Sequence, residues 1–588
     1  MPNTLEIYKL QEPDSLATAI ANKYVAWDNS RDKWYSNAKE TLQNLYATST
    51  HDITNQCHDW DNSTHIPKLT QIRDMLITYY LDAMFGLPDF IDWEAYDTNS
   101  TDVATKNTLK NIAKQMLNDS DFKPTIRQLV EDYVDYGNAF ATAVPYQKTL
   151  GQDLLYAGPK AFRIDPMDIF FDPLASTFEQ SPKIIRTTMT LGELMQSAEQ
   201  FTDDENLFNK ALKKAMKKRH QIYNTIAANN KDVIVDDMCR IAGFDSWSTY
   251  YASDVVELLT FYGDLYDCDS GKLHKKCRIV VMDRAYVLLE EPIKDYGFGC
   301  NIFKAGWRDR KDNLWSMSPL DNIKGMQYMV DFLENKRADV FNFISNPMVV
   351  TQGDAEMPEY LFPGCHIGLD TDAKIDFIRP DATALQADLY IQNYLNQMEE
   401  MAGMPKEAMG FRTPGEKTAF EVSQLNTAAS RLFNEKVHKF ELEMLEPLIT
   451  LMIRIYMSDS NRIVVVKSTT DNGTEYFEEV NLEDIKTQGR FVAIGSSTYT
   501  EKAQIAQTLM QMSNTALYAD PLVSNWINPE VTAKALIYAT GLDKFDGILK
   551  KNGRVMSELD MRSTAESANQ IMDQQIAQGM ANAEQGIM

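Results

Sequence analysis

The sequence lacks the short motifs by which several large enzyme classes are recognised. It has no G-x-x-x-x-G-K-[ST] loop to cradle a nucleoside triphosphate, no H-E-x-x-H zinc motif and no G-x-S-x-G nucleophile turn. The neighbouring carboxylates Asp203-Asp204 and Asp236-Asp237 do not converge on one metal ion, because adjacent side chains on a helix diverge. We therefore expect no catalytic residue, no metal and no cofactor, and an architectural role.

Cysteine and histidine are also scarce, with six and seven residues in 588. No C-x-x-C pair occurs, so free thiols in a reducing cytoplasm are expected. Four potential ligands, His51, Cys57, His58 and His65, fall within fifteen residues. Their spacing matches no familiar zinc pattern and polar residues surround them, which favours an ordinary loop, with a zinc site as the alternative.

No apolar run approaches the 18 residues of a membrane-spanning helix. The best candidate, Leu448 to Tyr456, is short and contains Arg454. The start, Met1 to Glu6, has no basic-then-apolar pattern of a signal peptide. We expect no membrane partner.

The chain is short of positive charge. Its net charge is −26 and its pI about 4.8, unlike a conventional DNA-binding protein with a basic face. The exception is a basic cluster at helical spacing, Lys210, Lys213, Lys214, Lys217, Lys218 and Arg219. A solvated helix face is the simpler interpretation, and contact with DNA or an acidic partner is the alternative.

What is present is a long series of helical and strand patterns, enough for several modules in 588 residues. Apolar periodicity predicts five helices in the first 140 residues, at about 15–27, 31–47, 68–85, 105–117 and 123–136. Strand and turn character follows at 161–173, and a helical insert at about 191–242. Hairpins are predicted for 255–266 with 274–282 and for 462–467 with 474–480, and further strands at 285–290 and 491–494.

The stretch from Ser318 to Ser458 has the clearest internal order. Ser318-Pro319-Leu320-Asp321 is a strong helix start, and Asn346-Pro347 is a helix stop. About 35 residues of strand and turn character follow, and a second helix begins near Pro380-Asp381. A very long helix is predicted from about Glu416 to Met457, with Pro447 inside it.

Apolar residues recur three or four apart along the first two of these helices. They predict an apolar packing stripe, with Lys324, Asp331, Glu334 and Asp339 of the first helix on the solvated side. The stripe consists of Ile323, Met326, Val330, Leu333 and Val340 in the first helix and Leu385, Leu389 and Leu395 in the second.

The order of helix, small β module, helix, loop and long kinked helix resembles the portal (head-to-tail connector) proteins of tailed bacteriophages. The run RTPGEKTAFEV, Arg412 to Val422, also looks like the segment that enters the family's long helix. The resemblance extends from about Tyr24 to Gly547. It implies an α+β, mainly helical subunit with a wing, stem helices, a small α/β clip and a helical crown, assembling as a ring.

The resemblance also implies how the chain is divided into modules. Residues 1–317 would form the N-terminal helical region and wing. The next modules would be the first stem helix (318–346), the clip (347–380), the second stem helix (381–402) and the tunnel loop (403–415). The long kinked helix (416–457), the wing β return (458–499), and the crown with a flexible C-terminal tail (500–588) would follow. Candidate DNA-channel residues in and beside the tunnel loop are Lys406, Met409, Phe411, Arg412 and Lys417.

A portal is a dodecameric ring at one capsid vertex, assembled in the host cytoplasm, through which double-stranded DNA is packaged and ejected. The resemblance therefore implies these partners: further copies of the chain, the major capsid protein, the terminase large subunit, head-tail adaptor or tail proteins, and a scaffold protein. Twelve chains at −26 carry about −312 charges. Such a ring offers DNA few cations to replace its counterions, so the duplex would slide, although an acidic surface also simply keeps a large assembly soluble.

Two alternative functions belong to other classes of protein. One is a different virion structural protein, such as a tail adaptor or internal core protein. The other is a metal-dependent nucleic-acid enzyme whose site is assembled from carboxylates far apart in the sequence.

Overall fold

The computed structural model has a mixed α+β fold. The chain divides into two units, 1–466 with 478–496, and 467–477 with 497–588. The residues described lie almost entirely in the first unit and are 5–7, 13–53, 61–85, 90–95, 103–150, 153–199, 207–228, 250, 253–267, 271–294, 296–345, 348–353, 355–356, 368–369, 372, 374–378, 386–402, 433–458, 463–469, 475–481, 489–493, 509 and 532.

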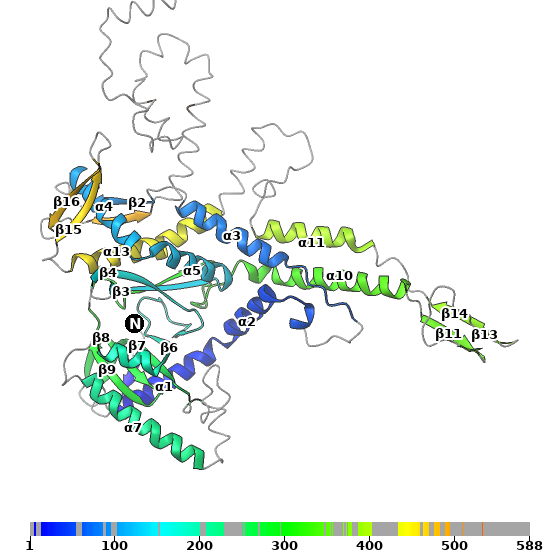
Figure 1. Cartoon of the computed structure of the whole chain (residues 1–588), viewed down its shortest axis with the longest axis horizontal. Coiled ribbons are helices and arrows are strands. Elements are labelled where there is room, and N and C mark those ends of the chain that lie inside the picture. Colours follow the sequence, from blue (N-terminus) through cyan, green and yellow to red (C-terminus); the bar gives the residue numbers. More distant parts are fainter. Residues whose placement is uncertain are drawn as a thin grey trace, which may run out of the picture. The chain divides into compact units, whose positions relative to one another are not determined.

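Among the described residues, the largest sheet has six strands (Figure 1). Five strands are antiparallel neighbours, and β1 lies parallel to the end of β7. In sheet order they are β5 (Ile169–Phe171), β6 (Lys183–Thr190), β7 (Val255–Asp267), β8 (Lys272–Met282) and β9 (Tyr286–Pro292), with β1 at Leu5–Ile7. The predicted hairpin at 255–282 and the strand after it are confirmed.

Helices cover both faces of this sheet. On one face α1 (Pro13–Ser30) packs Leu16, Ile20 and Trp27 against strand residues such as Phe261. On the other face α6 (Leu191–Glu199) and α7 (Leu207–Ala228) pack against β7, β8 and β9. Both faces are therefore apolar, and successive side chains of each strand point alternately into two buried layers.

The other predicted N-terminal helices are also confirmed, with ends shifted by no more than two residues. They are α2 (Asp32–Tyr46), α3 (Lys68–Phe85), α4 (Val103–Asp119) and α5 (Phe122–Asp135), and a short 3₁₀ turn, η1, spans Thr50–Asp52. α3 and α5 help to form the largest core, beside the sheet of β10 (Ile302–Gly306), β3 (Asn138–Leu150) and β4 (Asp153–Ile164).

The long helix predicted to end at Met457 is described from residue 433. It contains a π-helical turn, η5 (Glu441–Leu445), immediately before α13 (Glu446–Met457), in which Pro447 lies in the first turn. Proline lacks an N–H and its ring clashes with the carbonyl four residues earlier, so the wider π turn removes the conflict. A π turn therefore lies where the sequence predicts a kink. α13 buries most of its side chains in the largest core.

Two further strand pairs involve C-terminal residues. β15 (Ile463–Thr469) pairs with β16 (Glu475–Asn481), which confirms the predicted hairpin. β17 (Gly489–Ala493) instead pairs antiparallel with β2 (Ile91–Ala95), a strand that the sequence analysis missed. Phe491 and Trp93, one from each strand, pack their rings 4.8 Å apart.

The segment that follows β10 contains a helix, a β excursion and a second helix. α10 (Lys324–Ser345) follows a 3₁₀ turn, η3 (Leu320–Asn322), and α11 (Asp388–Met401) lies beside it (Figure 1). Between them β11 (Met348–Gln352) pairs antiparallel with β14 (Lys374–Ile378), and β12 (Ala355–Glu356) pairs with β13 (Gly368–Leu369). The predicted order of helix, strands and helix is confirmed.

Candidate functional site

The start of α10 is fixed by Ser318. Its Oγ accepts the N–H of Leu320 at 3.0 Å and donates to the carbonyl oxygen of Val134 at 2.7 Å. The carboxylate of Asp321 accepts the N–H of Ser318 at 2.9 Å. The predicted cap is thus present, although the first turn is 3₁₀ and the α-helix begins at Lys324.

The predicted packing stripe meets the largest core only near the start of α10. Ile323 and Val330 are fully buried there, and Met326, Leu333 and Leu395 are half-buried against the same core. Val340 is half-buried and Leu389 is 69% exposed. Leu385 lies outside the described residues. The stripe is therefore a core element at one end of the helix pair and leaves the chain's own core at the other.

One buried side of α10 is polar. Gln327, Asp331, Asn335 and Asp339 recur every four residues, and none is more than 9% exposed. The prediction that Asp331 and Asp339 are solvated is wrong, and so is that for Lys324, whose ammonium group is buried and bonded to Glu40 at 2.6 Å. Acidic side chains at core-facing positions need donors to satisfy them.

Those donors come from residues 61–66, here called the strap. Asp339 accepts the backbone N–H and the side-chain amide of Asn62 at 2.9 and 2.8 Å. Asn335 accepts the N–H of Thr64 at 2.8 Å and donates to its carbonyl oxygen at 2.9 Å. The side chains of α10 thus pair with the strap backbone much as a neighbouring strand would.

The same pattern continues toward the start of α10. Asp331 accepts the N–H of Ile66 at 3.0 Å and pairs with Nδ1 of His65 at 2.7 Å, where both side chains are almost fully buried. Gln327 donates to the carbonyl oxygen of Ile66 at 2.5 Å and accepts the N–H of Leu69 at 3.1 Å. His65, one of the four potential zinc ligands, is thus paired with a carboxylate, whereas Cys57 and His58 lie outside the described residues, so both interpretations of this loop stay predictions. Among the described residues no group of three or more His, Cys, Asp or Glu side chains is placed to hold a metal ion.

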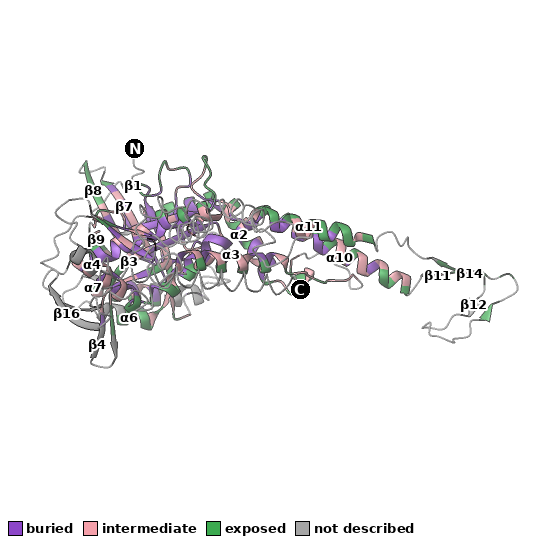
Figure 2. Cartoon of the chain, turned by 90° about the horizontal axis from the view of Figure 1, so that it is seen from above, coloured by how far each residue is buried: buried purple, intermediate pink, exposed green. Residues whose placement is uncertain are grey.

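Many residues along the helix pair are exposed (Figure 2), and several of them are large and apolar. On α10, Met329 is 40% and Phe332 55% exposed, and they share one helix face. The remaining exposed hydrophobic residues of the pair are Phe341, Leu389, Tyr390 and Met401. The face of α10 that holds Met329 and Phe332 side by side is therefore a candidate contact surface.

Ion pairs fix the direction of α11. Arg337, in the later part of α10, pairs with Asp388 at the start of α11 and with Glu334 at 2.6 Å. At the other end of α11, Glu399 pairs with Lys68 of α3 at 2.6 Å, and both side chains are mostly buried. The two helices are therefore antiparallel.

Several predicted sites lie outside the described residues. These are the tunnel-loop and nearby candidates Lys406, Met409, Phe411, Arg412 and Lys417, together with nearly all of the crown and the whole C-terminal tail. The structure thus leaves the DNA-channel assignment a prediction.

The basic cluster divides into two parts. Lys210, Lys213, Lys214 and Lys217 are exposed on α7. Arg219 is only 6% exposed and donates to the carbonyl oxygen of Val255 at 2.6 Å and to Asp283 at 3.4 Å. Its place on a solvated face is therefore a wrong prediction, because the guanidinium group instead satisfies buried oxygens.

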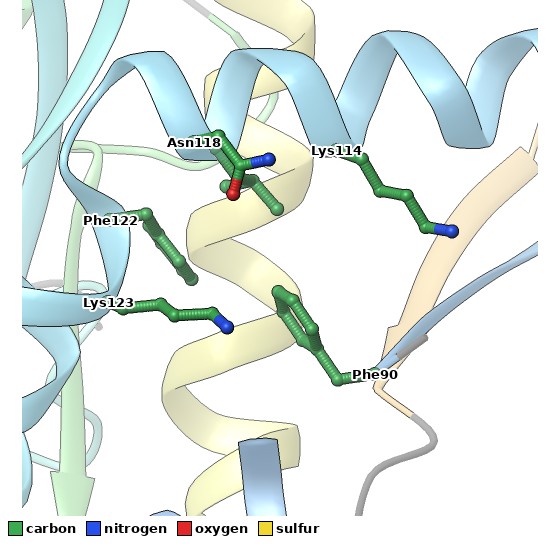
Figure 3. Close-up of a pocket in the computed structure, with 6 residues that line it drawn as sticks. Phe90, Lys114, Asn118, Phe122 and Lys123 are labelled. Carbon is green, nitrogen blue, oxygen red and sulfur yellow. The ribbon is translucent and has the colours of Figure 1, made fainter. Parts of the chain in front are cut away.

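A small cavity of about 80 Å³ lies between α4 and the start of α5. The side chains of Phe122 and Lys123 point toward Phe90 across it (Figure 3). Its remaining lining residues are Lys114, Leu117 and Asn118. The polar side chains of this lining are Lys114, Asn118 and Lys123, and no carboxylate, thiol or hydroxyl group accompanies them.

Several buried charged groups elsewhere have structural partners. Arg163 binds Asp132 through two nitrogens at 2.5 and 2.7 Å, and Arg73 binds Asp135 at 2.6 and 2.7 Å. Lys183 is completely buried and donates to the carbonyl oxygen of Ser181 at 2.8 Å. Its burial lowers its pKa to about 8. These groups join elements of the fold.

Comparison with known proteins places the chain in no group. No protein-family model matches it, and no curated protein was found to be similar. Within the described part of the chain, every helix is too short or too polar to cross a lipid bilayer.

The contact between α10 and the strap was not predicted, although the four-residue spacing of Gln327, Asp331, Asn335 and Asp339 is visible in the sequence. The exposure of Met329, Phe332 and Phe341 was not predicted either. The recurrence of a polar residue at every fourth position was the available signal for the strap contact, but a solvated helix face gives the same pattern.

Proposed function

We propose that this chain is the subunit of a phage portal, a non-enzymatic dodecameric ring that forms the channel for packaging and ejecting double-stranded DNA. The order of elements supports the proposal. Two antiparallel helices, α10 and α11, are joined by a small β excursion, and a kinked helix with a π turn follows them in the chain. In a portal these would be the stem, the clip and the long kinked helix.

The observation that carries the proposal is the inverted polarity of α10. Its inner side is polar and already hydrogen-bonded to the strap, so the exposed Met329 and Phe332 cannot be buried by turning the helix inward. They are therefore available for contact with another molecule.

A second copy of the same chain supplies such a surface. α11 exposes Leu389 and Tyr390, which differ from the apolar residues that α10 exposes. Two different apolar surfaces on one chain suit a head-to-tail contact, in which α10 of one copy meets α11 of the next. Repetition of that contact closes a ring when the rotation permits.

The remaining partners follow from the portal assignment. The clip would face the terminase large subunit during packaging and the head-tail adaptor or tail proteins afterwards, and the wing would meet the major capsid protein and a scaffold protein. The assembly would lie at the portal vertex of the virion. The net charge of −26 per chain supports a conduit along which DNA slides, because few cations are offered to its phosphates.

Electron microscopy of the purified full-length chain tests the proposal. We expect class averages that show a closed ring with a central channel and a stalk built from the α10–α11 pairs. Particles without a channel, or without the stalk, would instead favour a tail adaptor or an internal core protein. Cleavage of DNA by the pure protein, dependent on a divalent metal, would favour an enzyme.

A further inference from the structure

Helix α7 has one buried side and one basic side. Leu212 and Ala215 pack on the six-stranded sheet. Lys210, Lys213, Lys214 and Lys217, here called the lysine face, are all exposed. Spacings of three, four and seven residues place the four lysines on one side of the helix, over about 10 Å of its length.

The rotation of α7 about its axis is fixed by the residues that follow the lysine face. Arg219 donates to the carbonyl oxygens of Tyr250 and Val255 at 3.2 and 2.6 Å. The ammonium group of Lys218 lies 4.8 Å from the centre of the Tyr286 ring. These contacts hold the helix with its four lysines turned outward, so the lysine face is a fixed feature of the surface.

The lysine face is unneutralised within the described structure. None of its four ammonium groups forms a salt bridge with an acidic residue that the structure describes. This is notable in a chain with 84 acidic and 58 basic residues, where an acidic neighbour is the common case. Four adjacent positive charges raise the local concentration of an anionic partner.

The surroundings of the four lysines favour a phosphate backbone over a protein partner. Between residues 209 and 220 no large hydrophobic side chain is exposed. Protein interfaces rely on buried aromatic or aliphatic anchors and are depleted in lysine, whereas interfaces with nucleic acid are polar and positively charged. An exposed aromatic residue for stacking on unpaired bases is also missing there, which favours a duplex over a single strand.

We propose that the lysine face of α7 binds the phosphate backbone of double-stranded nucleic acid without sequence preference. Lysine ammonium groups act as point charges and do not read base edges. The charge of −26 opposes binding at long range, but at 0.1–0.15 M salt the Debye length is only about 8–10 Å, so the local charge of α7 dominates. This proposal does not depend on ring formation.

The test measures binding of the full-length chain to a 30-base-pair DNA duplex by fluorescence anisotropy at several salt concentrations between 0.1 and 0.25 M. Each phosphate contact contributes about 0.9 to the slope of log K against log salt. The double variant Lys213→Gln/Lys217→Gln should therefore reduce the slope by about 1.8 and lower affinity up to about eightfold per lysine near 0.1 M salt. Affinity should be the same for duplexes of different sequence.

Lys272→Gln/Lys275→Gln is the matched control, because these lysines are exposed on β8 and the change in charge is equal. The control should bind as the wild type does. Equal losses in both variants would overturn the proposal in favour of diffuse charge attraction. Wild-type protein that does not bind the duplex would also overturn it. Tighter binding of poly-L-glutamate than of the duplex to α7 would overturn the proposal as well, because it would indicate an acidic protein partner.

Discussion

The six-stranded sheet and the outer part of α10 bury their residues in opposite ways. In the sheet, Phe261 and Ile279 are completely buried, and helices cover both faces. Beyond Val330, α10 instead buries Asp331 and Asp339 and exposes Phe332. The sheet therefore gains stability from apolar area, whereas the inner contact of α10 depends on hydrogen bonds to the strap.

This difference separates two roles of a hydrophobic residue. Where it is covered by the same chain it stabilises the subunit, and where it stays exposed on a well-anchored helix it is available for assembly. The anchoring matters, because α10 is held by Ser318 at its start, by the strap along one side and by Arg337 to α11. A loose helix would turn its apolar residues inward.

The largest expected effect is the loss of a buried ring from the sheet. Phe261→Ala should lower the free energy of unfolding by about 3–5 kcal/mol, because it leaves a cavity between α1 and the sheet. Phe332→Ala, the matched change on α10, should shift it by no more than about 0.5 kcal/mol. Urea denaturation of both variants at low protein concentration measures this. Equal losses would show that Phe332 is covered within the subunit and would remove the contrast.

The next effect concerns the strap. Asp331→Ala removes the acceptor for the N–H of Ile66, for Nε2 of Gln327 and for the His65 ring. Buried donors without acceptors should cost about 2–4 kcal/mol of unfolding free energy. Asp331→Asn, which keeps one acceptor oxygen, should lose less. Urea denaturation of the two variants checks the order, and an unchanged stability of Asp331→Ala would mean that the strap does not hold α10.

The most gradual effect is a pH dependence in the sheet. Burial lowers the pKa of Lys183 to about 8 from its usual 10.5, so between these values the folded state binds fewer protons than the unfolded state. The free energy of unfolding should therefore rise with pH across that window, by at most about 1.4 kcal/mol per unit. Below pH 8 both states are protonated and the contribution is constant.

The variant Lys183→Met isolates this contribution. The stability difference, wild type minus variant, should increase from pH 8 to pH 10.5 and stay flat below pH 8. Lys272→Met, on an exposed lysine of β8, is the control and should show no such change. A flat difference for both variants would show that Lys183 keeps an ordinary pKa.

The sequence predicted most elements because local signals set their ends. Ser318 and Asn346-Pro347 bracket α10, and the hairpin of β15 and β16 was predicted from Asp471-Asn472-Gly473. The pairing of β17 with β2 was missed, since these strands lie almost 400 residues apart in the chain and no local signal joins them.

Burial along α10 was less predictable. The periodicity correctly placed Ile323 and Val330 in the core. It misplaced Asp331 and Asp339, because the buried surface opposite them is backbone, which prefers polar partners. The burial of Arg219 was not predicted for the same reason, because its partners are backbone carbonyl oxygens.

The central claim is that the exposed apolar residues of α10 join copies of the chain. Native mass measurement of the wild type and of Met329→Ser/Phe332→Ser tests it most directly. We expect a wild-type ring of about 804 kDa (12 × 67.0 kDa), and smaller species for the variant with an unchanged free energy of unfolding. Wild-type protein that remains monomeric across conditions, or a variant that assembles as well as the wild type, would contradict it.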